Sequence, residues 1–156
     1  DERQRIFLAD GRAHVREATA CPAYDLIFLD AYQAEGVPAH LLTYDFYAAC
    51  RACLDQYGLV ISNLHSSTPV YDAARKTFAA SFIHTTACSV QSGNVIVLGS
   101  EAVTLNPQTI WEHARVTQDA YAGVLPFSKW VKNISLRVPY QSSARILRDS
   151  GLSVSI

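Results

Sequence analysis

The chain has 156 residues, 49% of them hydrophobic, and a formal net charge of -1. This size and composition predict one globular domain with a sizeable core. Lysine and arginine form no block that could follow a phosphate backbone, which argues against nucleic acid as a partner. No apolar stretch approaches the roughly 18 to 20 residues that cross a bilayer, so no membrane partner is expected. The first residue is Asp1 rather than Met, which leaves open a piece of a longer polypeptide.

The chain opens with one strand–helix unit. Residues 5–9, R-I-F-L-A, predict a short strand that ends at Asp10 and Gly11. A short helix is expected to follow it through His14 and Glu17. This order is the beginning of an α/β alternation.

The next run, Y-D-L-I-F-L-D over residues 24–30, is the most informative part of the sequence. Leu26 to Leu29 leave no polar face, so we expect a strand covered on both sides, as in the centre of a parallel sheet. Asp30 stands at its carboxyl end, where ligands bind in open α/β sheets. The alternative is that Asp30 only begins a loop or caps a helix.

A helical period follows this strand. Thr43 is expected to cap the first turn, in which Asp45 favours the positive end of the helix dipole. Gly58 then ends a loop, and residues 59–62 predict another strand that closes on Asn63. The apolar stripe of the helix consists of Leu42, Phe46, Ala49, Cys50, Cys53 and Leu54.

Ser67, Thr68 and Pro69 predict the start of a helix, with proline at its first position, and this helix ends near Ser81. Two strand-like runs at residues 82–90 and 94–99 then predict an antiparallel hairpin. A last helix is expected from Asn106 and Pro107 to about Tyr121. The residues of the earlier helix that are predicted to face inward are Val70, Ala73, Ala74, Thr77 and Phe78.

Alternating strands and helices imply a doubly wound α/β sheet with right-handed crossovers. The final antiparallel hairpin is unusual in dinucleotide-binding domains and habitual in the Rossmann-like S-adenosylmethionine-dependent methyltransferase fold. We therefore expect a mostly parallel sheet with flanking helices over residues 1–122. Residues 123–156 are expected to extend the same domain, with Arg137, Arg145 and Arg148 on a solvated basic face.

Other groups with possible chemistry favour structural roles. Cys50 and Cys53 have the spacing of a zinc knuckle or redox pair, but they lie in a predicted helix and nothing completes a tetrahedral site. Two buried thiols in a reduced, cytoplasmic chain without a metal are the better interpretation. The His65-Ser66-Ser67 run lacks the G-x-S-x-G elbow of a nucleophilic serine, so a loop before a helix is favoured.

Three motifs follow one another at characteristic intervals: D-G-R at residues 10–12, Y-D-L-I-F-L-D at 24–30 and G-V-P-A-H-L-L-T-Y-D-F-Y at 36–47. With them the chain resembles the spermidine/spermine synthase family over residues 6–100. That family consists of polyamine aminopropyltransferases built on the methyltransferase fold. The resemblance implies decarboxylated S-adenosylmethionine as the co-substrate, a small amine as the acceptor and a homodimer as the assembly.

The resemblance also implies residue roles. Asp10, with Gly11, matches the pair whose carboxylate accepts a hydrogen bond from the adenine amino group. Asp30 matches the aspartate that takes a proton from the attacking amine, which is mostly protonated at neutral pH. An apolar floor under the adenine and thioether is implied at Pro38, Ala39 and Leu42. The alternatives are an ordinary strand-to-helix turn for the first pair and simple packing for these three residues.

Two departures from the family pattern stand out. A second aspartate that grips the diamine is replaced by Gln33, and the next residue is Ala34 rather than proline. Glu35 is a candidate to compensate, and Tyr32 and Gln33 are the candidates to bind the substrate. The chain also begins at what resembles the third strand and contains no G-x-G-x-x-G turn. It is therefore either the carboxyl-terminal part of a larger polypeptide, which we favour, or a shortened homologue whose uncovered edge self-associates.

Three functions follow from these features. A spermidine synthase-like aminopropyltransferase domain is supported by the motif at residues 36–47. A methyltransferase that uses S-adenosylmethionine on another substrate is supported by the neutral Gln33. A non-catalytic relative that keeps the sheet as a scaffold is supported by the missing glycine-rich turn.

Overall fold

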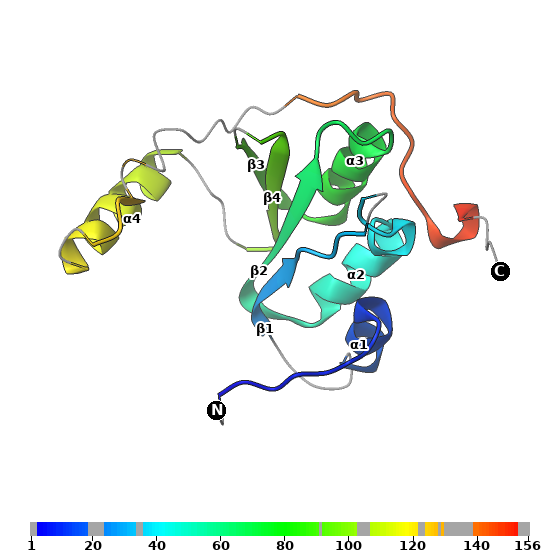
Figure 1. The fold of residues 1–156 in the computed structure, drawn as a ribbon, viewed down its shortest axis with the longest axis horizontal. Helices are drawn as coiled ribbons and strands as arrows, with labels where there is room; N and C mark the ends of the chain where they lie inside the picture. Colours follow the sequence, from blue (N-terminus) through cyan, green and yellow to red (C-terminus); the bar gives the residue numbers. More distant parts are fainter. Residues whose placement is uncertain are drawn as a thin grey trace.

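The computed structural model describes residues 3–18, 24–33, 36–90, 92–102, 107–121, 124–127, 129 and 139–152 (Figure 1). Within these residues the sheet has the strand order β1 (Tyr24–Leu29), β2 (Leu54–His65), β4 (Asn94–Ser100) and β3 (His84–Ser89). β1 and β2 are parallel, whereas β4 is antiparallel to both of its neighbours. Three strands therefore share one direction, and the predicted mostly parallel sheet with a terminal hairpin is confirmed.

The helices α1 (Gly11–Ala18), α2 (Tyr44–Ala52) and α3 (Tyr71–Ser81) pack side by side along the sheet, and α4 (Pro107–Ala120) lies apart from them (Figure 1). The described residues also include two short 3-10 helices, η1 (Ala39–Leu41) and η2 (Asp149–Gly151). All four helices occur where the sequence predicts them, with small differences in their bounds.

The start of α2 shows why its sequence forms a helix. Thr43 Oγ1 accepts a hydrogen bond from the backbone N–H of Phe46 at 3.1 Å, so one of the unpaired amides of the first turn is satisfied. Asp45 lies in that turn, where a negative charge favours the helix dipole. Both sequence predictions for this helix start are confirmed.

Alternate residues of the strands lie on one face of the sheet, which we call the helix-covered face. Val60, Ser62 and Leu64 of β2 are all buried there. The register pairs Ser62 with Val97 and Leu64 with Val95, so these two residues of β4 extend the same buried surface. α2 and α3 pack against this surface.

An aromatic cluster fills the space between the helices and this face. Phe46, Tyr47, Phe78 and Phe82 are buried. The Tyr47 and Phe78 rings meet edge to face with centroids 5.1 Å apart, and the Phe78 and Phe82 centroids are 4.9 Å apart. These separations are those of favourable aromatic pairs, and they place the centre of the core between α2 and α3.

We call the opposite side of the sheet the open face. The side chains that β1 places there show that the prediction of a central strand at residues 24–29 is wrong for the described sheet. Among the described strands, β1 lies at the edge of the sheet and pairs with β2 alone. Its residues Leu26 and Phe28 are 48% and 67% exposed, whereas Ile27 and Leu29 pack against the core. The apolar run is therefore covered on one side in the described structure, because α1, α2 and α3 lie on that side (Figure 1).

The first predicted strand is wrong as well. Residues 4–8 form no helix or strand, and Ile6, Phe7 and Leu8 are 85%, 64% and 105% exposed. A strand needs a partner for its backbone hydrogen bonds, and this segment has none among the described strands. An apolar run in the sequence does not by itself supply a strand to pair with.

Two further bounds differ from the predictions. β2 begins at Leu54 rather than Leu59, so Gly58 lies inside the strand instead of ending a loop. A Cβ at Gly58 would lie 2.8 Å from the carbonyl oxygen of Tyr24, which explains why this position carries glycine. α3 begins at Tyr71, after a turn that contains Pro69, and Val70 is 42% exposed rather than inward.

Residues 139–152, which we call the C-terminal strap, run across α3 and α2 towards α1. The buried Leu147 anchors the strap, because its N–H donates to Thr77 Oγ1 at 2.8 Å. Its carbonyl oxygen accepts a hydrogen bond from the N–H of Tyr44 at 2.9 Å. The strap thus joins the middle of α3 to the first turn of α2.

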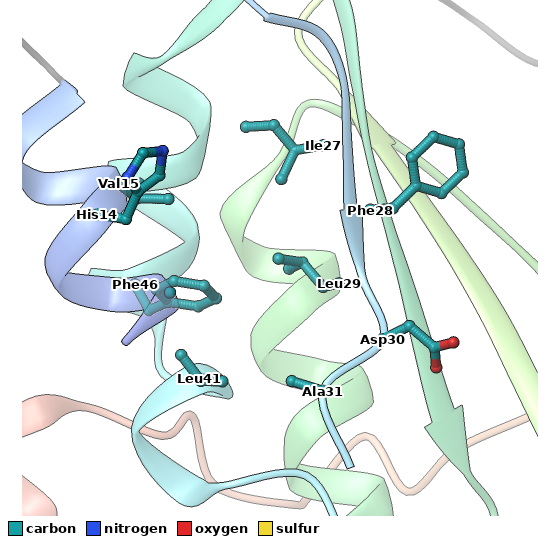
Figure 2. Close-up of a pocket in the computed structure, with 10 residues that line it drawn as sticks. His14, Val15, Ile27, Phe28, Leu29, Asp30, Ala31, Leu41 and Phe46 are labelled. Carbon is teal, nitrogen blue, oxygen red and sulfur yellow. The ribbon is translucent and has the colours of Figure 1, made fainter. Parts of the chain in front are cut away.

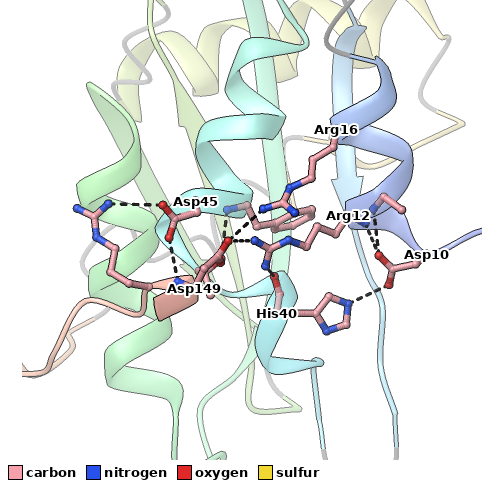
Figure 3. Close-up of polar contacts among 10 residues, drawn as sticks. Asp10, Arg12, Arg16, His40, Asp45 and Asp149 are labelled. Carbon is pink, nitrogen blue, oxygen red and sulfur yellow. Dashed lines mark hydrogen bonds and ion pairs between the residues drawn. The ribbon is translucent and has the colours of Figure 1, made fainter. Parts of the chain in front are cut away.

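Asp149 fastens the end of the strap (Figure 3). Its carboxylate accepts a hydrogen bond from Thr43 Oγ1 at 2.8 Å and forms ion pairs with Arg12 and Arg16 of α1. Its N–H donates to Asp45 Oδ2 at 2.9 Å. One acidic residue therefore links the strap to two helices.

Arg148 is exposed, as predicted for a basic face near the carboxyl end, and it also makes contacts with α2. Its guanidinium lies 4.0 Å from the centre of the Tyr44 ring, and one of its nitrogens is 3.8 Å from Asp45 Oδ1. Arg145 is exposed, as predicted. Arg137 lies outside the described residues.

Candidate functional site

An apolar pocket of about 420 Å³ lies between α1, the start of α2 and β1 (Figure 2). In Figure 2, Ile27 and Leu29 project from β1 towards the helices, whereas Asp30 projects from the opposite side of the strand. The pocket opens near the carboxyl end of β1, where the sequence places the site. Its lining consists of Gly11, His14, Val15, Ile27, Phe28, Leu29, Asp30, Ala31, Leu41 and Phe46.

Asp30 borders this pocket and faces the open side of the sheet. Asn63 lies in β2 directly after Ser62, the partner of Leu29, and its Nδ2 donates to Asp30 Oδ1 at 3.0 Å. Asn63 Oδ1 is buried and has no hydrogen-bond partner among the described residues. The carboxylate of Asp30 is exposed, so its second oxygen is accessible to a ligand.

The two residues predicted to bind substrate lie beyond Asp30. Tyr32 Oη donates to the carbonyl oxygen of Asn63 at 3.1 Å, which holds the ring beside Asp30. Burial raises the pKa of the Tyr32 hydroxyl, and the Asp30 carboxylate raises it further, so the phenol stays neutral at physiological pH. Gln33 is exposed and exchanges backbone hydrogen bonds of 2.9 and 3.1 Å with Gly36. Glu35 lies outside the described residues.

Asp10 begins α1 and contacts η1 (Figure 3). Its Oδ1 accepts hydrogen bonds from the N–H groups of Arg12 and Ala13, both at 3.0 Å, and its Oδ2 lies 2.9 Å from His40 Nε2. The hydrogen bond with His40, followed by that with Ala13, holds the pKa of Asp10 below its ordinary value. Gly11 lines the pocket, whereas Asp10 itself does not.

The residues predicted as an apolar floor lie in and around η1. Pro38 precedes this short helix, Ala39 is its exposed first residue, and Leu42 is buried in the main core. None of these three lines the pocket. Their neighbours Leu41 and Phe46 do so.

The cysteines lie away from this site. Cys50 and Cys53 are buried and free, as the sequence predicts, and burial raises the pKa of the Cys50 thiol to about 12. In the described part of the chain, no group of three or more His, Cys, Asp or Glu side chains could hold a metal ion. The described helices also include none that is long and apolar enough to cross a membrane.

The structure brings Asp30 and Tyr32 together through Asn63, and it groups Asp10 with His40 rather than with Asp30. The sequence analysis named neither Asn63 nor His40 as a site residue. Asn63 could have been found from the sequence, because an apolar run precedes it, as another precedes Asp30. His40 gave no comparable signal, since its contact depends on how η1 meets α1.

Three comparisons place this geometry among known proteins. No protein-family model matches the chain. A curated polyamine aminopropyltransferase of Vibrio vulnificus (strain CMCP6) is 26% identical over 152 residues, which cover 93% of this chain and 50% of that protein. The chain therefore spans about half the length of this relative.

Two solved structures share the fold. A probable spermidine synthase from Corynebacterium glutamicum ATCC 13032 has a TM-score of 0.59 at 21% identity, over 91% of this chain and 56% of that chain. Human methyltransferase-like protein 13, solved in complex with SAH, has a TM-score of 0.62 at 16% identity, over 92% of this chain and 64% of that chain. The chain thus has the methyltransferase-type α/β fold, and its predicted resemblance to the polyamine aminopropyltransferases is confirmed.

Proposed function

We propose that this chain forms the amine-binding part of a spermidine synthase-like aminopropyltransferase. The observation that carries the proposal is the match to a curated polyamine aminopropyltransferase over 93% of the chain, with Asp30 at the carboxyl end of β1 beside an apolar pocket. The donor in this proposal is decarboxylated S-adenosylmethionine, and the acceptor is a small amine. Both are substrates of the longer polypeptide of which this chain would supply about half.

The proposed reaction is a displacement on carbon. The amine nitrogen forms a bond to the aminopropyl carbon while the bond from that carbon to the sulfonium sulfur breaks, and a neutral thioether leaves. The amine must first lose a proton, because its pKa lies near that of lysine, roughly 10.4. Asp30 is the proposed acceptor of that proton. The remaining rate enhancement comes from alignment of the two substrates.

Asn63 supports Asp30 in this role. Its donation to Oδ1 fixes the carboxylate and leaves Oδ2 for the incoming ammonium. Asn63 Oδ1 is buried, so in this geometry it offers the ammonium no second acceptor. We therefore propose that the single carboxylate of Asp30, fixed by Asn63, holds the amine here, in place of the two carboxylates that the family pattern implies. Tyr32 would border this position, and Gln33 would reach the far end of the amine.

The pocket on the other side of β1 is the proposed place of the nucleoside. Its apolar lining suits an adenine ring and a thioether, and Gly11 leaves room for them, since no atom lies within 4 Å of a Cβ placed there. Asp10 already accepts two amide hydrogen bonds and contacts His40. A carboxylate has about four acceptor positions, so one remains for an adenine amino group. Pro38, Ala39 and Leu42 would then support the pocket from η1 rather than line it.

The test uses the natural polypeptide that contains this chain. Release of methylthioadenosine from decarboxylated S-adenosylmethionine is measured with putrescine or another diamine as the acceptor. Asp30→Asn should lower kcat/KM by about 10²–10⁴-fold, the range for loss of a general base. Asp25→Asn is the matched control, because Asp25 is exposed on the same strand away from the pocket. Full activity of Asp30→Asn would remove the proposed base.

A second function is favoured by one feature of the site. Gln33 is neutral and exposed, so the described residues offer the acceptor a single carboxylate where a dicationic diamine would use two. A methyltransferase that uses S-adenosylmethionine on a less charged substrate would fit that arrangement. Methyl transfer from S-adenosylmethionine, with no diamine-dependent release of methylthioadenosine, would select this function.

We also propose that the protein is cytoplasmic and forms a homodimer. The two buried free thiols fit a reducing compartment. In the described sheet, the outer edge of β1 has no neighbouring strand and so offers unpaired backbone groups to a second copy. Sedimentation of the natural polypeptide tests the assembly, and a monomer at micromolar concentration would contradict it.

A further inference from the structure

A buried arginine lies outside the candidate site. Arg75 of α3 is only 6% exposed, and its Nε and Nη1 are buried without a hydrogen-bond partner in the described part of the chain. A guanidinium keeps its charge at any physiological pH. A buried charge that lacks a partner is strongly unfavourable, so this position requires a group that accepts hydrogen bonds and carries negative charge.

Two hydroxyl groups beside Arg75 are also unpaired. Tyr71 lies one turn earlier on the same face of α3, and its Oη is buried without a partner among the described residues. Tyr47 Oη, from α2, is also buried without a hydrogen-bond partner among the described residues. Burial raises the pKa of the Tyr47 hydroxyl, whereas the Ser62 hydroxyl and the Arg75 charge lower it in part. No hydrogen bond of normal geometry joins Ser62 to the Tyr47 hydroxyl. Two guanidinium N–H groups and two phenol hydroxyls are therefore buried without a hydrogen-bond partner in the described part of the chain.

The carboxylates on the surrounding elements already have partners. Asp72 of α3 accepts a hydrogen bond from the N–H of Gln141 in the C-terminal strap. Asp45 of α2 accepts from the N–H of Asp149 and lies 3.8 Å from Arg148. Neither is paired with Arg75. The protein groups that this structure places around the guanidinium thus leave its charge uncompensated.

The C-terminal strap covers this place from outside. The Tyr140 ring stands over the Arg75 guanidinium, with 5.1 Å between the guanidinium carbon and the ring centre. Lys76 Nζ donates to the carbonyl oxygen of Ser142 at 2.6 Å, which holds the strap against α3 next to that contact. A ring face attracts the cation but accepts no hydrogen bond in the guanidinium plane. Because the unpaired atoms are buried beneath the strap, a partner for them must be small.

We propose that Arg75, together with the hydroxyl groups of Tyr47 and Tyr71, binds a small inorganic anion of chloride size between α2, α3 and β2. The anion neutralises the guanidinium and accepts hydrogen bonds from Nε, Nη1 and the two phenols. The site is separate from the pocket beside β1, so it does not depend on the proposed activity. It joins α2, α3 and the strap around one charge.

A direct test uses bromide as the probe. Crystals of the protein grown or soaked in sodium bromide should show an anomalous peak within hydrogen-bond distance of Arg75 Nε or Nη1. An ordered water or a protein carboxylate at that place, without an anomalous peak, would overturn the proposal. This measurement uses the unaltered protein, so it is decisive even if substitutions of Arg75 fail to fold.

A solution test compares thermal unfolding in sodium chloride and in sodium gluconate at equal ionic strength. An anion that binds only the folded state raises Tm as its concentration rises. The wild type should therefore melt higher in chloride than in gluconate, and Arg75→Met should lose this difference. Arg145→Met is the matched control, because Arg145 is exposed, and it should keep the difference. Equal Tm values of the wild type in the two salts would overturn the proposal.

Discussion

The two faces of the sheet differ in what covers them, although their strands are equally apolar. On the helix-covered face, Val60 and Val97 are fully buried beneath α2 and α3. On the open face, Phe28 is 67% exposed and Leu26 is 48% exposed. β1 contributes to both faces through one uninterrupted apolar run. The contrast shows that an apolar run contains side chains that can be buried, whereas the neighbouring elements decide which of those side chains are buried.

The faces differ in chemistry as well as in burial. The apolar pocket lies on the helix-covered side of β1, whereas Asp30 projects from the other side (Figure 2). There it accepts the hydrogen bond from Asn63. A reaction between a nucleoside in the pocket and an amine at Asp30 would therefore take place around the carboxyl end of β1. The following predictions test how unequal the two faces are.

The largest effect is expected in the aromatic cluster of the helix-covered face. Phe78→Ala should lower the free energy of unfolding by roughly 3–5 kcal/mol, because it removes a fully buried ring and leaves a cavity. Urea denaturation followed by circular dichroism measures the change. Phe28→Ala is the matched control on the open face, and an equal loss there would contradict the contrast.

The strap should contribute almost as much to the same face. Leu147→Ala should lower the free energy of unfolding by roughly 2 kcal/mol or more, because Leu147 is buried between α2 and α3. The same denaturation experiment measures this change in the free energy of unfolding. Ile146→Ala, one residue away and 36% exposed, should cost clearly less. Equal costs would show that the strap does not share in the core.

Thr43 is expected to give an intermediate effect. Thr43→Ala removes the cap of α2 and the hydrogen bond to Asp149, so we expect a loss of about 1–2 kcal/mol. Thr85→Ala on β3 is the control, because Thr85 is exposed and makes neither contact. A loss no greater than that of the control would mean that neither bond stabilises the fold.

A smaller, pH-dependent effect is expected at Asp10. Its pKa is lowered in the folded state by His40 and the first amides of α1, so its contribution to stability is present above the ordinary aspartate pKa. That contribution is lost as the pH falls through the lowered pKa. Asp10→Asn should therefore reduce Tm at pH 6, and the difference from wild type should shrink towards pH 3. A constant difference across this range would contradict the assignment.

The smallest effect on stability is expected on the open face itself. Phe28→Ser should leave the free energy of unfolding within about 0.5 kcal/mol of wild type, because the ring is mostly exposed. It should instead reduce concentration-dependent self-association, since exposed apolar groups on an edge strand promote it. Analytical ultracentrifugation checks this. Unchanged association together with a large loss of stability would show that Phe28 is buried in solution.

The sequence predicted the elements better than their surroundings. The helix start at Thr43 was readable because its cap is a local contact, and the hairpin of β3 and β4 was readable from the short polar turn between two apolar runs. The strand predicted at residues 5–9 failed because a strand exists only where another strand pairs with it. Of the site, Asp30 was found by its place after an apolar run. Its contact with Asn63 depends on the register of two strands that are far apart in sequence.

By itself the sequence determined the α/β alternation, the start of α2 and the carboxylate at the end of β1, because these depend on residues within a few positions of one another. Among the described residues, tertiary structure alone decided that β1 lies at an edge, that Asp149 of the strap pairs with Arg12, and that Arg75 Nε and Nη1 are buried without a hydrogen-bond partner. Each of these depends on which distant segments meet. Contacts of that kind are set by the packing of the whole chain rather than by any local pattern.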